Sequence, residues 1–253
     1  MWCLLGGLTL VIIIVVVCVL QYKACKKEPY RPDYPINFLS LKQTKYLLET
    51  DFDGYGSSLN LTNLKACGVS DFPDLISKWS RSAMGWTLPQ QEKLKEAIKL
   101  VEYTINTRAS ILPTKKQLSD IEWNFACTIH PYYLDGLSHT RGDIIFLSDK
   151  VVSQISVKTL AGILLHEKIH IWQRKFPEDM QRWIDDKGFV ATSHRVFDDL
   201  LERSNPDTNG IIYKDLGVKF TSLNPLDLHS VKYNSSRDHP HEQMASEIQK
   251  WVD

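Results

Sequence analysis

The chain has 253 residues, and 43% of them are hydrophobic, which is enough to build the core of one large domain or two small ones. Its 30 basic and 30 acidic residues cancel, and all of them follow Tyr22. A chain with this balance has no electrostatic footprint for a phosphate backbone, so we expect no nucleic-acid partner.

The first 22 residues predict a transmembrane anchor. They contain no charged side chain, and residues 2–22 as one helix would be about 31 Å long, close to the thickness of a bilayer core. Trp2 and Tyr22 stand where interfacial aromatic side chains are expected. The alternative is a cleaved signal peptide, but no basic side chain precedes the apolar run and no small-x-small cleavage site follows it. We therefore expect residues 2–22 to stay in a lipid bilayer.

The orientation of this anchor follows from the charges on its C-terminal side. The basic side chains that follow it most closely are Lys23, Lys26, Lys27 and Arg31. The positive-inside tendency then predicts a single-pass membrane protein whose C-terminal domain is cytoplasmic. Prolines at 29, 32 and 35 predict that residues 23–37 form a Pro-rich juxtamembrane spacer, which leaves residues 38–253 for the folded domain.

The first part of this domain is predicted to be helical. Apolar spacing favours helices over residues 38–48 and 71–81, with a Gly-, Ser- and Asn-rich loop at 51–63 between them. Thr87 and Gln90 have the spacing of a capping box, so a longer helix is expected from there to residue 107. That helix would bury Leu94, Ile98, Val101 and Ile105.

Two strands are predicted next. Residues 121–129 alternate apolar with mostly polar side chains, which is typical of a half-buried strand. A turn-rich piece follows, and the β-rich run at 143–147 predicts a second strand just before the next helix. Such a strand matters for function, because a protease cleft needs an exposed sheet edge on which an extended substrate can bind as an added strand.

The helix after this strand contains His166-Glu167-Lys168-Ile169-His170, with Ser156 or Thr159 as its N-cap and Pro177 beyond its end. Residues four apart on a helix differ by about 40° and ~6 Å, so His166 and His170 project from one face. Two imidazoles there can occupy two corners of a zinc tetrahedron, and Glu167 can act as general base on a zinc-activated water. The alternative is a buried helix whose two histidines are only hydrogen-bonded.

The remainder of the chain is expected to hold a short helix, a strand and a final helix. Residues 190–203, which include His194, have helical spacing, and the stretch after them is rich in Asn, Pro, Asp and Gly. Residues 210–213 are a strand candidate. The last helix is predicted to start at Pro240 and to contain Glu242 and Glu247.

A catalytic zinc site needs a third protein ligand and one open position. The metzincin pattern would place Gly at 173 and His at 176, where this chain has Gln173 and Phe176, so that family is excluded. The remaining helical option is a carboxylate on a second helix. The candidates are Glu242 and Glu247, with His194, His239 and His241 as competitors.

Position on the last helix favours Glu242 over Glu247. Glu242 falls in the first turn after Pro240, where the helix N-terminus favours an ionised carboxylate. Glu247 lies five residues on, about 140° further round, so the two side chains cannot both face the metal. We therefore expect Glu242 to be the third ligand.

The motif HEKIH followed far downstream by HEQMAS resembles the gluzincin zinc metallopeptidases. The second helix of that family has a Glu ligand and, one turn later, a polar residue that supports a zinc-binding His. Glu242 matches the ligand position, and Ser246 falls at the support position, where Asp is usual and where Glu247 is the alternative. The segments TRGDIIFLS, LLHEKIHIWQRKFP and HPHEQMASEI are also similar to membrane-associated metalloproteases of large DNA viruses.

This resemblance implies an α+β fold with a zincin-like catalytic domain behind the transmembrane helix. A small mixed sheet would place its edge strand on the helix of the zinc motif, and the second ligand-bearing helix would lie at the C-terminus. The implied activity is that of a zinc (Zn2+) endopeptidase acting on a polypeptide substrate, on the cytoplasmic side or, in a virus, inside the virion. An oxyanion-stabilising residue is also implied, and the candidates are His139, Arg141, Tyr213 and Tyr233.

A second hypothesis belongs to another class of protein. The chain would be a membrane-anchored structural or scaffold protein with a zincin fold that binds zinc but does not cut. The two hypotheses share the ligands His166, His170 and Glu242 and differ in the role of Glu167.

The charge asymmetry around the anchor predicts that residues 23–253 face the cytosol or a virion interior. Protease added outside intact membranes should leave this part uncut, since the bilayer shields it. The sequons at Asn60 and Asn234 should carry no glycan. Digestion from the lumenal or external side, or glycan at either asparagine, would contradict the predicted topology.

Overall fold

The computed structural model describes residues 35–108, 113–195, 207–208, 211–213 and 239–252. The predicted anchor and the spacer up to residue 34 lie outside these ranges. Within them, no helix is both long enough and apolar enough to cross a membrane. The compact unit that contains the site runs from Tyr34 to Asp253. Its first strand, β1 (Ile36–Phe38), takes in two residues that the sequence assigned to the spacer.

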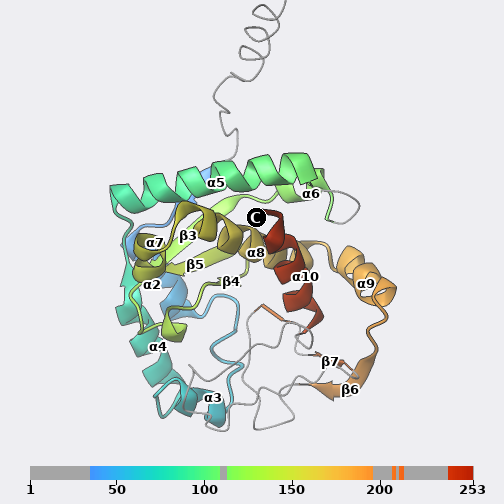
Figure 1. Ribbon diagram of the computed structural model, residues 1–253. Helices are drawn as coiled ribbons and strands as arrows, with labels where there is room; N and C mark the ends of the chain where they lie inside the picture. The colour runs from blue at the N-terminus through green and yellow to red at the C-terminus, as the bar shows by residue number, and fades with distance from the viewer. Residues whose placement is uncertain (1–34, 109–112, 196–206, 209–210, 214–238, 253) are drawn as a thin grey trace, which may run out of the picture. The chain divides into compact units, whose positions relative to one another are not determined.

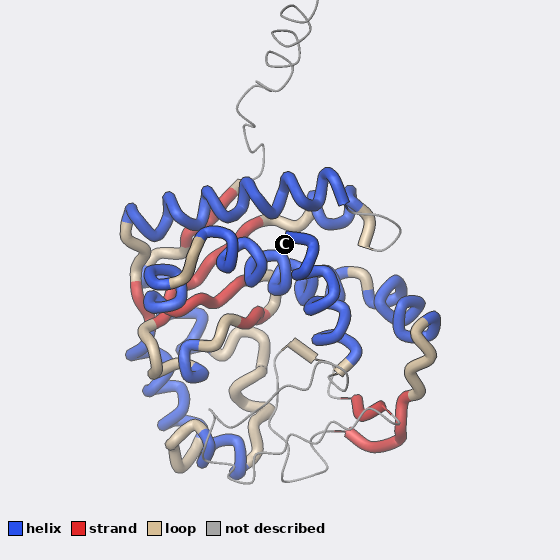
Figure 2. The backbone as a smooth tube through the Cα atoms, in the orientation of Figure 1, coloured by secondary structure: helices blue, strands red, loops and turns tan. Residues whose placement is uncertain are grey.

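The fold is α+β, as predicted, and a five-stranded mixed sheet lies at its centre. The order of four strands is β1-β3-β5-β4, and the fifth, β2, pairs with β3. β1, β3 and β5 are parallel, whereas β2 and β4 are antiparallel to their neighbours; the strands run side by side in Figure 2. Their bounds are β2 (Ala83–Met84), β3 (Trp123–Thr128), β4 (His139–Arg141) and β5 (Ile144–Ser148).

Two predictions about these strands were wrong in detail. β3 is buried along almost its whole length rather than half-buried, because β1 and β5 flank it and helices cover both of its faces. β5, the strand expected just before the zinc-motif helix, is internal to the sheet. Among the described strands, β4 ends the strand order on one side and β1 ends it on the other, and β4 is the edge strand beside β5.

Alternating side chains divide the core between the two faces of the sheet. Ile145 and Leu147 pack in the cluster formed with α5, α8 and α10, whereas Ile144 and Phe146 pack in the cluster formed with α2 and α4. Figure 1 shows where these helices lie around the sheet. The helices of the first cluster are α5 (Leu88–Arg108), α8 (Val157–Lys175) and α10 (Pro240–Gln249), and those of the second are α2 (Leu41–Thr50) and α4 (Phe72–Ser82).

Local signals located the long helices well. Thr87 and Gln90 exchange hydrogen bonds at the start of α5, and this helix buries Leu94, Ile98, Val101 and Ile105, as predicted. Ser156 is the N-cap of α8, and its hydroxyl accepts a hydrogen bond from the Thr159 amide at 3.0 Å. The shorter helices are α3 (Leu61–Ala66), α6 (Lys115–Ser119), α7 (Asp149–Gln154) and α9 (Pro177–Asp186).

The helix predicted over residues 190–203 was wrong where the structure describes it. β6 (Ala191–Arg195) is a strand, and it pairs antiparallel with β7 (Ile211–Tyr213). Residues 196–203 lie outside the described ranges. β6 and β7 are more than a dozen residues apart in the sequence. Their pairing outweighed the helical spacing of apolar residues within 190–203, because tertiary contacts often decide the structure of weakly apolar segments. The strand expected at 210–213 is present as β7. In the first part of the domain, α3 begins at Leu61, inside the segment 51–63 that was predicted to be a loop.

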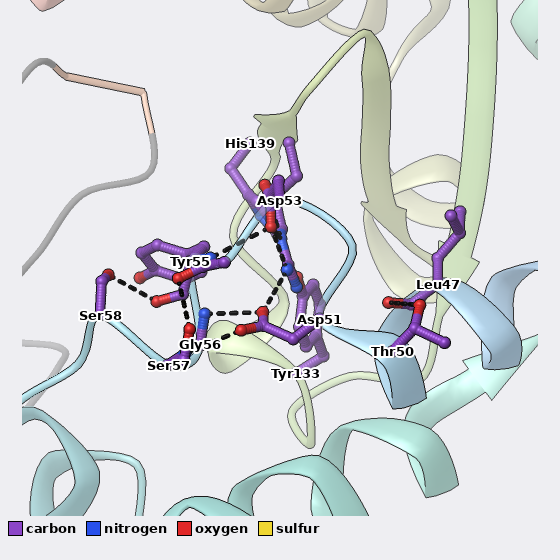
Figure 3. Close-up of polar contacts among 12 residues, drawn as sticks. Leu47, Thr50, Asp51, Asp53, Tyr55, Gly56, Ser57, Ser58, Tyr133 and His139 are labelled. Carbon is purple, nitrogen blue, oxygen red and sulfur yellow. Dashed lines mark hydrogen bonds and ion pairs between the residues drawn. The ribbon is translucent and has the colours of Figure 1, made fainter.

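The loop after α2 is held by one arginine of β4. The guanidinium of Arg141 is fully buried, donates to Asp51 at 2.7 Å and to Asp53 through Nε at 3.0 Å, and reaches the Tyr133 hydroxyl at 3.2 Å. Asp51 also accepts the amides of Gly56 and Ser57, both at 2.8 Å. Figure 3 shows these groups converging. Although burial opposes ionisation of Asp53, Arg141 lowers the pKa of its carboxyl.

Replacing Arg141 with Met should lower the free energy of unfolding by about 3–5 kcal/mol, because it leaves the nearly buried carboxylate of Asp51 and the partly exposed one of Asp53 without their buried cation. Urea unfolding of the full chain in detergent measures the effect. The matched control is Arg182→Met, whose ion pair with Asp179 is exposed and should leave the midpoint almost unchanged. Equal midpoints for both variants would contradict this account of the loop.

Candidate metal centre

Three side chains from two helices converge on one point. His166 and His170 lie one turn apart on α8, with 2.9 Å between their Nε2 atoms. Glu242, in the first turn of α10, places Oε2 at 3.3 Å from His166 Nε2 and 3.7 Å from His170 Nε2. One donor atom from each residue lies within 4.8 Å of the other two. Two imidazole nitrogens and one carboxylate oxygen at such separations are a donor set that suits zinc.

The start of α10 fixes the position of Glu242. His239 is the N-cap, with its Nδ1 accepting the amide of His241 at 3.2 Å, and Pro240 occupies the first helical position. The helix N-terminus favours an ionised carboxylate in this turn. Although burial opposes ionisation, His170 and His166 hold the pKa of Glu242 well below its usual value. The carboxylate is therefore charged and ready to bind a cation.

Gln173 orients His170 and links the two helices. Its Oε1 lies 2.9 Å from His170 Nδ1, and its Nε2 donates to the main-chain oxygen of His241 at 2.8 Å. A hydrogen bond from Nδ1 leaves the Nε2 lone pair directed at the convergence point. The support expected from Ser246 or Glu247 was therefore placed wrongly. Glu247 is exposed and pairs with Lys187 at 3.2 Å.

Two buried polar atoms at the site have no hydrogen-bond partner among the described residues: Nδ1 of His166 and Oε2 of Glu167. The Glu167 carboxyl is 3% exposed, and its oxygen lies within 4.8 Å of donor atoms of His170 and Asp207. Burial, reinforced by the Asp207 carboxylate, raises the pKa of Glu167 well above its usual value. A carboxyl in this environment accepts a proton readily, which is the property of a general base.

The potential at the site is negative. Burial opposes protonation of His170, yet the carboxylates of Asp207 and Glu242 raise its pKa to about 10. A field that retains a proton on a buried imidazole also favours a divalent cation at the same point. The residues present therefore fit zinc in chemistry as well as in spacing.

Asp207 belongs to the site and was not predicted from the sequence. It accepts the Thr140 amide at 3.0 Å, bonds to the Thr140 hydroxyl, and lies 3.7 Å from Nη1 of Arg174. Its main-chain oxygen is 3.4 Å from His241 Nδ1. No local signal distinguishes this aspartate, because it stands in a segment rich in Asn, Pro and Asp.

The described competitors for the third ligand, His239, His241 and Glu247, lie outside the donor set. Among the described residues, the groups of three that could hold a metal contain neither His239, His241 nor Glu247. Burial lowers the pKa of His239 to about 3 and that of His241 to about 4, so both imidazoles are neutral. His194 lies in β6, and its side chain is outside the described part of the chain.

Two of the four oxyanion candidates are engaged in the core. Nε2 of His139 is 3.2 Å from the Tyr133 hydroxyl, and Arg141 holds the loop after α2. Tyr213 is buried in β7, with its ring centroid 5.4 Å from that of His239. Tyr233 lies outside the described residues. Tyr213 is thus the described candidate that lies next to a helix of the metal centre.

Lys168 lies on the side of α8 away from the metal centre, against Glu102, Ile121 and Trp123. Its fully buried Nζ donates to the Ile121 carbonyl at 2.8 Å, lies 3.5 Å from Glu102 and sits 3.9 Å from the centroid of the Trp123 ring. Burial lowers the pKa of Lys168 to about 8 despite the nearby carboxylate. These contacts fix the rotation of α8 about its axis.

No protein-family model, curated protein or solved structure matches the chain.

Glu242→Ala should weaken zinc binding by more than about 100-fold, because losing an inner ligand costs more than the 10–100-fold typical of an outer partner. Competition with a chromophoric chelator measures the affinity on full-length protein in detergent. Glu247→Ala is the matched control, since its carboxylate lies on the same helix but faces solvent. Retained affinity in the Glu242 variant together with zinc loss in His194→Ala would point to a three-histidine site instead.

Proposed function

We propose that this protein is a membrane-anchored zinc endopeptidase whose zinc ligands are His166, His170 and Glu242. The observation that carries the proposal is the convergence of three donor atoms beside a buried carboxyl, Glu167, with a raised pKa. Donor set, spacing and neighbouring base all agree with metal-assisted hydrolysis.

Each residue has a defined part in the reaction. Bound zinc would polarise the scissile carbonyl and lower the pKa of water. Glu167 would take a proton from the attacking water and later deliver it to the leaving amine. Gln173 would keep the Nε2 lone pair of His170 directed at the metal.

The position of β4 supports a polypeptide substrate. β4 is an edge strand among the described strands, and Arg174 of α8 donates to the Thr140 hydroxyl in it and to the Gly142 carbonyl just beyond it, the latter at 2.8 Å. An extended chain that paired with this edge would pass beside the zinc-motif helix. Tyr213 or Tyr233 would stabilise the oxyanion, since His139 and Arg141 are engaged in the core.

The second candidate is a zinc-binding scaffold protein without peptidase activity. Asp207 favours it, because a carboxylate beside Glu167 and His170 could complete a closed, structural zinc site. Activity of Glu167 variants separates the two candidates. For both, the anchor at residues 2–22 and a cytoplasmic or virion-interior domain remain part of the proposal.

Glu167→Gln should lower peptide turnover by about 10²–10⁴-fold while zinc stoichiometry stays unchanged, because the substitution removes the base and leaves the ligands in place. Cleavage of a peptide library and metal analysis of the same preparation measure both quantities. His166→Ala is the comparison variant, and it should lose zinc as well as activity.

Near wild-type turnover in the Gln variant would show that Glu167 is not the base. Zinc binding without turnover in the wild type, and not only in the Gln variant, would favour the scaffold candidate.

A further inference from the structure

The outer edge of β4 is already occupied by side chains. The Thr140 amide does not bond to β5 but donates to Asp207 Oδ1 at 3.0 Å, so it faces the edge of the sheet. Two residues on, the Gly142 carbonyl accepts from Nη2 and Nε of Arg174 at 2.8 and 3.2 Å. The outward amide of Thr140 and the Gly142 carbonyl just beyond the strand are thus engaged by Asp207 and Arg174.

The groups around the Asp207 carboxylate form a built anion site. A main-chain amide and a hydroxyl of Thr140 bond to it, and the Arg174 guanidinium lies 3.7 Å away. Thr140 is fully buried, and Asp207 is 7% exposed. Arg174 Nη2 also donates to the Thr140 hydroxyl, which ties these donors into one unit. A positive group and two neutral donors recognise a carboxylate.

This carboxylate lies where a substrate would have to pass. One oxygen of Asp207 is within 4.8 Å of donor atoms of both Glu167 and His170. The same residue therefore bonds to the strand edge and approaches the proposed base and metal. A peptide cannot pair with Thr140 and lie against Glu167 while Asp207 is in place.

We propose that Thr140 and Arg174 form a carboxylate-binding subsite, which Asp207 fills in cis as a substitute for a carboxylate of the substrate. The subsite selects peptides with an acidic residue next to the scissile bond, and Asp207 competes with them. This inference rests on the proposed peptidase function. It predicts that removing Asp207 activates the protein instead of inactivating it.

The experiment compares full-length wild type, Asp207→Ala and Asp207→Asn in detergent, with Asp186→Ala as matched control because Asp186 is exposed on α9. The probes are peptide pairs that differ by Glu or Gln at one position near the scissile bond. Zinc content and the urea midpoint are measured on each preparation. The Asn variant retains an acceptor for Thr140 and keeps the test valid if the Ala variant folds poorly.

Asp207→Ala should raise kcat/KM by at least about 10-fold, mainly through KM, since a tethered competitor acts at millimolar effective concentration. The gain should be larger for Glu peptides than for Gln peptides. Adding Arg174→Gln to Asp207→Ala should remove the preference for Glu and retain the gain on Gln peptides. Asp186→Ala should match the wild type.

Other outcomes overturn the inference in distinguishable ways. Zinc loss in Asp207→Ala would make Asp207 a ligand, and zinc-replete variants that cut no faster would show that it does not compete. Equal gains for Glu and Gln peptides would remove the carboxylate preference. Absence of both zinc and cleavage in all four proteins would overturn the proposed function, and this inference with it.

Discussion

The burial of α8 is the constraint on which the site depends. This helix is covered by α5 and the sheet on one side and by α10 on another, so the charged residues in its middle, Glu167 and Lys168, are buried away from bulk water. Each must find a partner inside the protein, because an unpaired buried charge is costly. Lys168 finds Glu102, the Ile121 carbonyl and the Trp123 ring on the side facing α5 and β3. On the other side, the carboxylates of Asp207 and Glu242 favour the protonated form of His170, whereas burial and Asp207 raise the pKa of Glu167.

Because α8 is buried against α10, the three donor atoms of the metal centre are already held together by helix packing. α8 and α10 pack through apolar side chains, including Leu165, Ile169, Met244 and Ala245, and Gln173 adds a polar link between them. Because the helices are packed and bridged, the imidazoles and Glu242 lie together without any loop to position them. Sites built on rigid elements hold their geometry more closely than sites on loops.

The sequence predicted those parts of the site that depend on local geometry. The spacing of His166 and His170, and the position of Glu242 in the first turn after Pro240, follow from helix geometry alone. Residues that reach the site through tertiary contacts were not predicted. The sequence used Gln173 only to exclude the metzincin family and did not assign it the role of orienting His170. Asp207 was not identified, because no residue near it in the sequence marks it as part of a site. The fold shows the same division. Capping signals located α5 and α8, whereas the internal place of β5 and the pairing of β6 with β7 depend on partners distant in sequence.

β4 shows why residue type alone could not assign roles near the site. Successive side chains of a strand point to opposite faces, so His139 and Arg141 share one face while Thr140 occupies the other. His139 and Arg141 contact Tyr133 and belong with the cluster around α2 and α4, where Arg141 neutralises Asp51 and Asp53. Thr140 faces α8, and its hydroxyl bonds to Arg174 and Asp207.

Two Arg–Asp pairs thus meet the same three-residue strand from opposite faces with different consequences. At Arg141 the guanidinium is fully buried and ties the strand to the loop after α2, so its removal affects stability. The pair of Arg174 and Asp207 is partly open to solvent and adjoins the proposed base, so a carboxylate from another chain can compete for it. Because side chains alternate along β4, Arg141 stabilises the loop after α2 on one face, and Thr140 belongs to the proposed carboxylate subsite on the other.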